Sequence, residues 1–420
     1  MNSLCRQFLA GISLFILATA FTAEKSYADI SPTVVQKHLQ SGDLAGGVAA
    51  LQGVLLKDPQ DDTARFGLGI LQVLRGAEAW SQGLYKHGIT MRHTGNIPFL
   101  RLPLPENPHP ERLTYEKFRE MLIDFQGALS QAEATLAGVQ DQELQLPLRL
   151  LEARLDIDGD GQITYLNKEK TESNEQLNLI LRRFVPGMEA ENTIDFDYAD
   201  VLWLRGYCHL LLGLSEIILA YDGQELFNVS AHLFFADPVT PYPFLEMQSN
   251  DGWFTDITDL IALVHMIRLP VSEPQRLKNT LAHWEQMCSL SRLMVGEIQQ
   301  ETDKRAEWIP GPNQKSWNGI EVSQVMLTDW LDFVTELEAI LAGKKLLPFW
   351  RTSQKTAQKI QGVNFRKVFI EPRTLDVVLW IQGTAAAPYL EEGELVDPQL
   401  FNRLQQTFRG NFLGFAIWMN

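Results

Sequence analysis

Hydrophobic residues recur every three to four positions along most of this chain, which is the spacing of an amphipathic α-helix. Thr114 can cap the start of the clearest stripe, which consists of Phe118, Met121, Leu122, Phe125, Leu129, Ala132 and Leu136. Similar stripes run through residues 253–268, 273–300 and 320–342, and Gly343 ends the last of them. The pattern therefore predicts an all-α, multi-helix protein.

Residues 201–220 are almost continuously apolar and long enough to raise the question of a membrane span. Arg205, His209 and Glu216 interrupt this run. Charged residues are costly in a bilayer, so the segment is expected to be a buried helix of a soluble domain.

The last part of the chain carries three shorter signals. Pro372 near the start and Gly383 just past the end punctuate a segment that predicts a short buried helix. Residues 363–371 are the only serious strand candidate. The C-terminus is expected to dock into the core, or else to serve as an exposed tail for a partner, through Phe412, Phe415 and Trp418.

A proline-rich stretch at residues 96–111 marks the best domain boundary. Its five prolines forbid a regular helix. We expect an extended connector there, between a helical hairpin at 29–95 and a larger helical domain at 112–343. Residues 344–420 are expected to pack on that domain.

The hairpin segment shows a period of 34 residues. Gly42 and Gly76 are one period apart, as are Gly47 and Ser81. Pro59 lies between the two members of each pair. This spacing resembles a tetratricopeptide repeat, in which a glycine ends one helix, a small residue admits the next helix closely and a proline closes the unit. The match departs at Arg65, where the repeat has an aromatic residue. The resemblance implies a helical surface that meets a protein partner.

Residues 155–167, LDIDGDGQITYLN, place Asp156, Asp158 and Asp160 on alternate positions before Gly161. Alternate carboxylates converge on one hard cation as the backbone curls, and glycine permits the sharp turn. A divalent ion would also remove the repulsion among the three charges. The pattern resembles the EF-hand calcium loop over residues 156–167.

The resemblance implies Ca²⁺ held by Asp156, Asp158, Asp160, Gln162 through its carbonyl, Thr164 through water, and Asn167. Asn167 stands where the family has a bidentate glutamate, although Glu169 could substitute if the chain leaves the loop differently. Leu150, Leu151 and Leu155 are expected in the entering helix. A lone loop favours a structural ion of the weak extracellular class, ~10⁻⁴–10⁻³ M. The alternative is an acidic turn without metal.

Residues 1–28 have the features of a secretory signal peptide, with Arg6 before an apolar run of about 13 residues and then small residues. Cleavage fits after Ala20 or after Ala28, and the second is favoured. A retained anchor is the alternative, but the run is shorter than the ~20 residues that a span needs. The protein is therefore predicted to be exported, periplasmic in a Gram-negative bacterium and otherwise secreted.

Charge and cysteine content limit the partners. The chain has 36 basic and 52 acidic residues, a net charge of −16, and such a surface repels nucleic acid and anionic lipid. Beyond the signal segment only Cys208 and Cys288 remain. In an oxidising compartment they could form one disulfide; the alternative is two buried thiols.

Catalytic signals are sparse. Histidines 38, 87, 93, 109, 209, 232, 265 and 283 form no zinc-binding spacing, and no nucleophile or phosphate-binding motif occurs. Glu297, Glu301 and Asp303, with Glu297 and Glu301 expected on one helical face, precede Trp308 and could line a saccharide or peptide groove. The alternative is a solvated helix end.

Two hypotheses remain. The first is an exported calcium-binding helical protein with a binding or scaffold role. The second is a helical periplasmic enzyme, a hydrolase of cell-wall glycan or peptide, with calcium as structural support. The lack of a catalytic motif favours the first, whereas carboxylates and aromatic residues in one cleft would favour the second.

Overall fold

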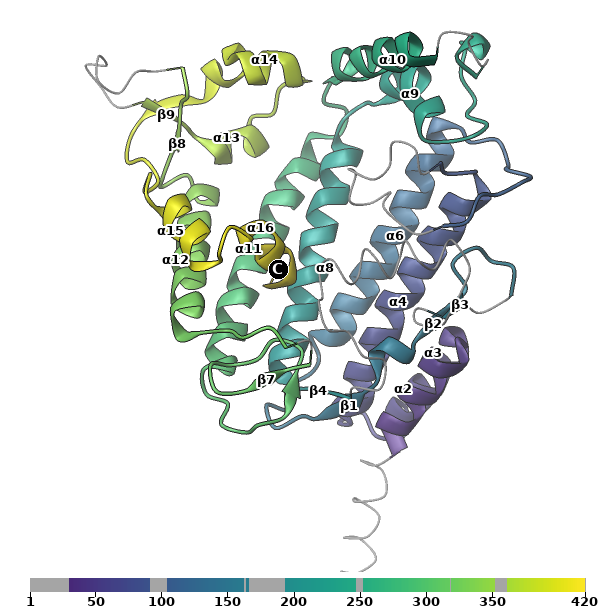
Figure 1. Cartoon of the computed structure of the whole chain (residues 1–420), viewed down its shortest axis with the longest axis vertical. Coiled ribbons are helices and arrows are strands. Elements are labelled where there is room, and N and C mark those ends of the chain that lie inside the picture. The colour runs from purple at the N-terminus through teal and green to yellow at the C-terminus, as the bar shows by residue number, and fades with distance from the viewer. Residues whose placement is uncertain are drawn as a thin grey trace, which may run out of the picture.

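The computed structural model describes residues 30–90, 104–161, 164–165, 193–246, 252–317, 319–351 and 361–419. Long helices dominate these residues, and their strands have three residues or fewer (Figure 1). The prediction of a mainly helical fold is confirmed. The α-helices are α2 (Ile30–Ser41), α3 (Leu44–Leu55), α4 (Asp62–Lys86), α6 (Tyr115–Leu136), α8 (Tyr198–Ala220), α9 (Gln224–Ser230), α10 (Gly252–Met266), α11 (Pro274–Ile298), α12 (Gln324–Leu341), α13 (Phe365–Ile370), α14 (Val377–Gln382), α15 (Leu400–Thr407) and α16 (Phe412–Met419).

Short 3₁₀ helices and strands join these elements. The 3₁₀ helices are η2 (Leu150–Glu152), η3 (Ala231–Leu233), η4 (Pro243–Glu246) and η5 (Thr384–Tyr389). The antiparallel pairs are β1 (Leu146–Leu148) with β4 (Ile194–Phe196), β2 (Arg154–Leu155) with β3 (Thr164–Tyr165), and β5 (Arg268–Leu269) with β10 (Leu375–Asp376). Strand β6 (Ala306–Glu307) runs parallel to β7 (Lys315–Ser316). Strand β9 (Gln361–Val363) lies between β8 (Leu347–Pro348) and β11 (Leu390–Glu392).

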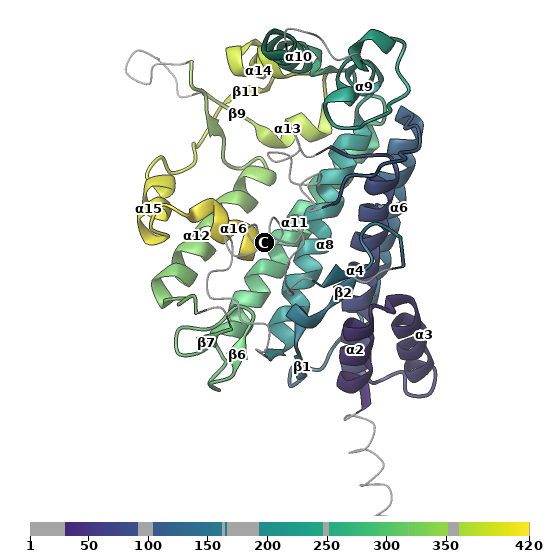
Figure 2. The same cartoon turned by 45° about the vertical axis from the view of Figure 1, so that its right-hand side comes forward.

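Helix α8 lies at the centre of the molecule. It packs against α11 and against α6, and Figures 1 and 2 both show α4, α6, α8 and α11 as neighbouring columns. Val201 and Cys208 of α8 join the hydrophobic cluster of the N-terminal helices, whereas Leu202 and Ala220 join a second cluster with α11. A helix that is apolar on both sides is expected to be buried in this way.

The apolar segment 201–220 therefore forms one helix that contributes buried residues to both hydrophobic clusters. Among the described residues, α8 is the one helix long and apolar enough to cross a membrane. Its buried Glu216 accepts a hydrogen bond from Arg276 of α11 at 2.8 Å. Glu216, one of the residues that interrupt the apolar run, thus links α8 to α11.

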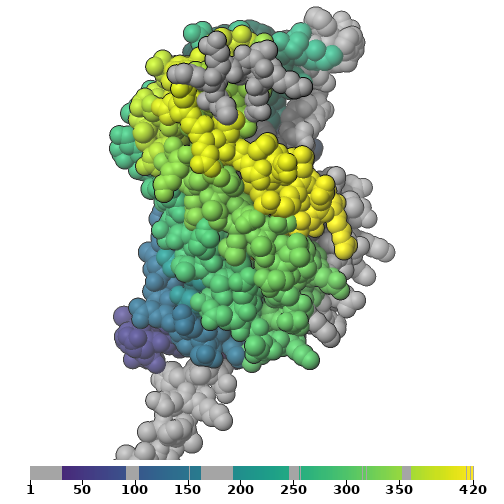
Figure 3. Space-filling model, turned by 90° about the vertical axis from the view of Figure 1, so that its left-hand side faces the viewer, coloured from purple at the N-terminus to yellow at the C-terminus, as the bar shows by residue number. Residues whose placement is uncertain are grey.

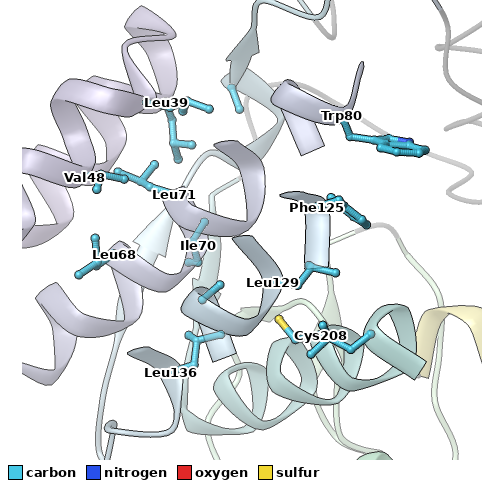
Figure 4. Packing of buried hydrophobic residues seen from close by; sticks show 14 of the residues in the cluster. Leu39, Val48, Leu68, Ile70, Leu71, Trp80, Phe125, Leu129, Leu136 and Cys208 are labelled. Carbon is cyan, nitrogen blue, oxygen red and sulfur yellow. The ribbon is translucent and has the colours of Figure 1, made fainter. Parts of the chain in front are cut away.

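Helices α2, α3 and α4 share their hydrophobic cluster with α6 and α8. Figure 4 shows Leu39 and Val48 beside Leu71 of α4, and Leu129 of α6 near Cys208. Helix α4 is thus covered by the two short helices on one side and by α6 on the other. The N-terminal helices contribute to the same core as the helices that follow.

The two glycines of the 34-residue period have different environments. Gly42 follows the end of α2 with a positive φ of 72°, as a helix-ending glycine does. Gly76 lies inside α4, which runs unbroken from Asp62 to Lys86. The tetratricopeptide resemblance remains a prediction. The proline-rich connector falls partly outside the described residues, which resume at Leu104.

The C-terminal segment packs against α11 and α12. Phe412, Phe415 and Met419 of α16 are buried in the cluster around Trp330, and Trp203 of α8 donates its indole hydrogen to the carbonyl of Trp418 at 2.7 Å. Figure 3 shows this segment, in yellow, crossing the green helices of that face. The aromatic tail is part of the core.

Most predicted helices occur close to their expected bounds. Helix α6 begins after Thr114, whose hydroxyl accepts a hydrogen bond from the Lys117 amide at 3.1 Å. Helices α10, α11 and α12 match the stripes at 253–268, 273–300 and 320–342. Gly343, with φ of 71°, follows α12.

The predicted strand at residues 363–371 is wrong. Of these residues only Val363 belongs to a strand, as the last residue of β9, and α13 follows it. Asn364 caps this helix by accepting a hydrogen bond from the Lys367 amide, and Phe365 and Phe369 meet on one helical face at 5.1 Å. Burial of that face against α11 outweighs the β propensity of the segment.

The short helix near the C-terminus is present but is not buried. Helix α14 starts after Asp376, which caps it, and ends at Gly383 with φ of 107°. Its Val378, Leu379 and Ile381 are exposed, and Ile381 is 71% exposed. Gly383 marked the end of this helix, but the apolar composition of the helix did not lead to its burial.

A close contact between α4 and α6 gives a stability prediction. A Cβ atom on Gly69 would lie 2.4 Å from Cδ2 of the fully buried Leu136. Gly69→Ala is expected to destabilise the protein by about 1–2 kcal/mol, because the helices must move apart. Gly53 of α3 has no neighbour within 4 Å, so Gly53→Ala should instead stabilise by up to about 1 kcal/mol. Urea unfolding of both variants measures this; equal midpoints would show that the α4–α6 contact is loose.

Candidate functional site

The acidic loop brings its three aspartates together. One carboxylate oxygen from each of Asp156, Asp158 and Asp160 can be chosen so that all three lie within 4.8 Å of one another. The Asp156 carboxylate accepts hydrogen bonds from the amides of Gly159 at 2.8 Å and Gly161 at 3.2 Å. Both glycines have φ of 75°, a backbone conformation that residues with a side chain rarely adopt. The loop thus curls around Asp156, as its sequence predicts.

Helix α4 holds the start of this loop. Glu78 accepts a hydrogen bond from the Asp156 amide at 2.8 Å, and Gln82 donates to the Asp156 carbonyl at 2.7 Å. Leu155 and Ile157 pack on the N-terminal core. An ion bound at the loop would therefore also fix the path of the chain along α4.

The expected entering helix is wrong. Leu150 begins the short η2, and Leu155 belongs to β2, which pairs with β3 through Leu155 and Thr164. The loop is therefore closed by a small antiparallel pair and does not follow an α-helix. This arrangement differs from the helix-loop-helix that the resemblance implies.

Gln162, Thr164 and Asn167, three of the six predicted ligands, cannot be tested against the structure. Gln162, Asn167 and the alternative Glu169 lie outside the described residues, and for Thr164 only the backbone is described. Asp156, Asp158 and Asp160 are the predicted ligands that the structure brings together.

Burial and mutual repulsion affect the protonation of this site. The pKa of Asp158 is raised, first by burial and then by the charges of Asp160 and Asp156. Burial also raises the pKa of Glu78. A cation would relieve this repulsion, so its binding is favoured where the carboxylates are ionised.

A second cluster of acidic groups lies at the N-terminal end of α8. Asp197 caps α8 and forms a capping box with the buried Asp200. Glu301, in the segment after α11, shares a side-chain hydrogen bond with Asp197. Glu307 of β6 is 3% exposed and is close enough to raise the pKa of Asp200.

These carboxyl groups share one electrostatic effect. Burial, and then the charge of Asp197, raises the pKa of Glu301 to about 8. The same two causes, in the same order, raise the pKa of Glu307 to about 9. The pKa of Asp200 is raised well above its usual range by burial and by Asp197. Glu301 and Glu307 are therefore mainly protonated at neutral pH.

Aromatic rings lie beside the carboxyl groups. Trp308 stacks on Trp317 with ring centroids 5.1 Å apart, and meets Trp203 at 5.3 Å and Phe196 at 6.1 Å. The indole nitrogen of Trp308 is buried without a hydrogen-bond partner among the described residues. A cavity of about 240 Å³ adjoins them, with lining residues that include Asp200, Tyr207 and Trp308.

The expected helical face of Glu297 and Glu301 is wrong, because α11 ends at Ile298. Glu301 nevertheless shares a side-chain hydrogen bond with Asp197. Asp197, Asp200 and Glu307 were not predicted as site residues from the sequence. The capping pattern of Asp197 and Asp200 before an apolar run was a readable signal for the helix start, but nothing local linked it to Glu301.

The cysteine alternative is resolved in favour of free thiols. Cys208 and Cys288 are both buried and unbridged. Burial raises the pKa of each thiol to about 12. Both therefore act as small hydrophobic residues of their helices.

No known protein family, curated protein or solved structure matches this chain.

Proposed function

We propose that this is an exported calcium-binding helical protein with a binding or scaffold role, in which Ca²⁺ is a structural ion of the 156–167 loop. The observation that carries the proposal is the convergence of Asp156, Asp158 and Asp160 within 4.8 Å. Three ionised carboxylates at this separation repel one another unless a cation lies between them. Hard divalent ions with oxygen ligands meet that requirement.

The attachment of the loop to α4 supports a structural role. Glu78 and Gln82 hold the backbone of Asp156 on both sides, through its amide and its carbonyl. A single loop held in this way stabilises one region and has no partner loop to open. Export remains a proposal from residues 1–28, and a protein partner of the N-terminal helices remains one from their repeat-like spacing.

Calorimetric titration of the protein with calcium tests the proposal. We expect one calcium ion to bind per protein, with a dissociation constant of ~10⁻⁴–10⁻³ M. Asp156→Ala/Asp160→Ala should abolish this binding, whereas Glu106→Gln, away from the loop, should not. No calcium heat in the intact protein, or the same heat in the double variant, rejects the site.

A hydrolase of cell-wall glycan or peptide is the second candidate function. It is favoured by the pairing of Glu301 with Asp197 next to the stacked Trp308 and Trp317. A carboxyl group with a pKa of about 8 can donate a proton at neutral pH, and its ionised neighbour can act as base or nucleophile. Tryptophan faces provide the apolar surface on which sugar rings pack.

Glu301→Gln is the matching experiment, since glutamine keeps the shape and loses the proton. If the pair is catalytic, hydrolysis of cell-wall glycan or peptide should fall by about 10²–10⁴-fold. The wild-type rate should decline above about pH 8, where Glu301 ionises. Glu321→Gln, at an exposed carboxylate outside this cluster, is the control. Equal rates in the intact protein and in Glu301→Gln would reject this candidate.

A further inference from the structure

Two histidines from facing helices meet beside the central packing of α8 and α11. The Nδ1 atoms of His209 (α8) and His283 (α11) are 2.9 Å apart, and the ring centroids are 5.1 Å apart. The residues are 74 positions apart in the chain, so no sequence spacing could reveal the pair. In the metal-free protein these two nitrogens share a hydrogen bond, and a metal ion would have to displace the proton between them.

A carboxylate fixes the orientation and tautomer of His209. Its Nε2 lies 3.5 Å from Oε1 of Glu133, an oxygen that also accepts hydrogen bonds from Nε and Nη2 of Arg205 at 3.0 and 2.9 Å. The hydrogen bond with His209, followed by those of Arg205, holds the pKa of Glu133 below its usual value against the effect of burial. An ionised Glu133 accepts the Nε2–H of His209, so the lone pair of Nδ1 faces His283.

His283 is also suited to remain neutral. Burial, and then the neighbouring His209, lower its pKa. The charged groups around the pair are matched across α6, α8 and α11: Glu133 pairs with Arg205, and Glu216 pairs with Arg276. The site therefore places two imidazoles within a polar surround of balanced charge.

The separation of the two nitrogens fits a particular metal geometry. With metal–nitrogen bonds of about 2.0–2.1 Å, two ligands at a right angle lie about 2.9 Å apart, whereas a tetrahedral angle needs about 3.3–3.4 Å. The observed 2.9 Å matches the right angle of square-planar and octahedral sites. Copper(II) and nickel(II) favour tetragonal coordination by imidazole.

We propose that His209 and His283 form a two-histidine site for a divalent transition-metal ion, copper(II) foremost, with Glu133 as the positioning residue behind His209. The order Glu133, His209, metal is the carboxylate–histidine–metal arrangement that orients ligands in metalloproteins. Water supplies the remaining positions, because the His209 side chain is 13% exposed. This site is independent of the calcium loop, whose ligands are carboxylates and favour hard ions.

Copper(II) titration of the untagged protein in millimolar calcium tests the proposal by electron paramagnetic resonance and calorimetry. One tight equivalent with hyperfine coupling to two imidazole nitrogens is expected. His283→Ala should weaken it at least tenfold and remove one nitrogen from the spectrum. Glu133→Gln should weaken it by about 10- to 100-fold while both nitrogens remain. Glu133→Asp, which restores the carboxylate, should recover part of the affinity.

His265→Ala, at an exposed histidine of α10, is the matched control and should bind copper as the intact protein does. Thermal melting in EDTA shows whether each variant folds. If His209→Ala does not fold, the proposal is tested with His283→Ala and Glu133→Gln. Copper affinity that is unchanged in both variants, or no tight equivalent in the intact protein, would show that the two rings share only a hydrogen bond.

Discussion

Glu307→Gln is expected to make the protein more stable than the wild type at pH 9 and about equally stable at pH 4.5. Glu307 is buried among acidic groups, and its pKa is raised from an ordinary 4.5 to about 9. Between these values the folded state binds a proton that the unfolded state has lost. The wild type therefore loses stability as pH rises through this window, and glutamine, which carries no charge, does not.

The size of the effect follows from the same linkage. The full shift corresponds to about 6 kcal/mol, and solvent screening of the neighbouring carboxylates reduces the expected gain to about 3 kcal/mol at pH 9. Chemical unfolding of both proteins at several pH values between 4.5 and 9 measures the difference. Glu301→Gln should act in the same direction over a window that ends near pH 8.

Glu321→Gln is the control, because it is the same substitution at an exposed glutamate outside the buried acidic cluster. Its unfolding curves should follow those of the wild type across the pH range. If the wild type instead gained stability relative to Glu307→Gln between pH 5 and 9, Glu307 would be ionised favourably in the folded protein. That result would contradict a raised pKa for Glu307.

Calcium is expected to raise the melting temperature, and EDTA to lower it. For the ~10⁻³ to ~10⁻⁴ M class, 10 mM calcium adds about 1.4–2.7 kcal/mol to the free energy of unfolding, since the ion binds only the folded loop. In a chain of this length that corresponds to a rise of about 2–3 °C. Differential scanning calorimetry in EDTA and in 10 mM calcium makes the comparison.

Asp156→Ala/Asp160→Ala should melt at one temperature in both solutions. Loss of the Asp156 hydrogen bonds with Gly159 and Gly161 lowers that temperature, and relief of carboxylate repulsion raises it. Removal of two repelling carboxylates accounts for any gain without the ion. Magnesium is a useful second ion, because its smaller octahedral shell suits a flexible oxygen loop less well. Identical wild-type melts in EDTA and calcium would make residues 155–167 an acidic turn.

Local patterns in the sequence located most helices and one possible ion site. Thr114 and Gly343 marked helix ends because capping depends on residues within one turn. Asp156, Asp158 and Asp160 converge because alternate residues of one tight loop are neighbours in any fold that keeps the turn. These features depend on contacts between residues close in the chain.

Other features had no local signal strong enough to predict them. Residues 363–371 have strand-like composition, but capping by Asn364 and packing of Phe369 on α11 make most of them helical. Leu155 belongs to a strand pair although an entering helix was expected, because Thr164 pairs with it after the turn. In both cases a competing contact outweighed propensity.

The sequence by itself determined the helical class, several helix ends and the acidic loop, since each rests on periodicity or on adjacent residues. Only the tertiary structure decided that Glu301 meets Asp197, and that His209 meets His283. These pairs join residues far apart in the chain, so they exist only once α8 and α11 pack. Burial in that packing then raises the pKa of Glu301 and Glu307 and lowers that of His283, and this chemistry cannot be read from residue types alone.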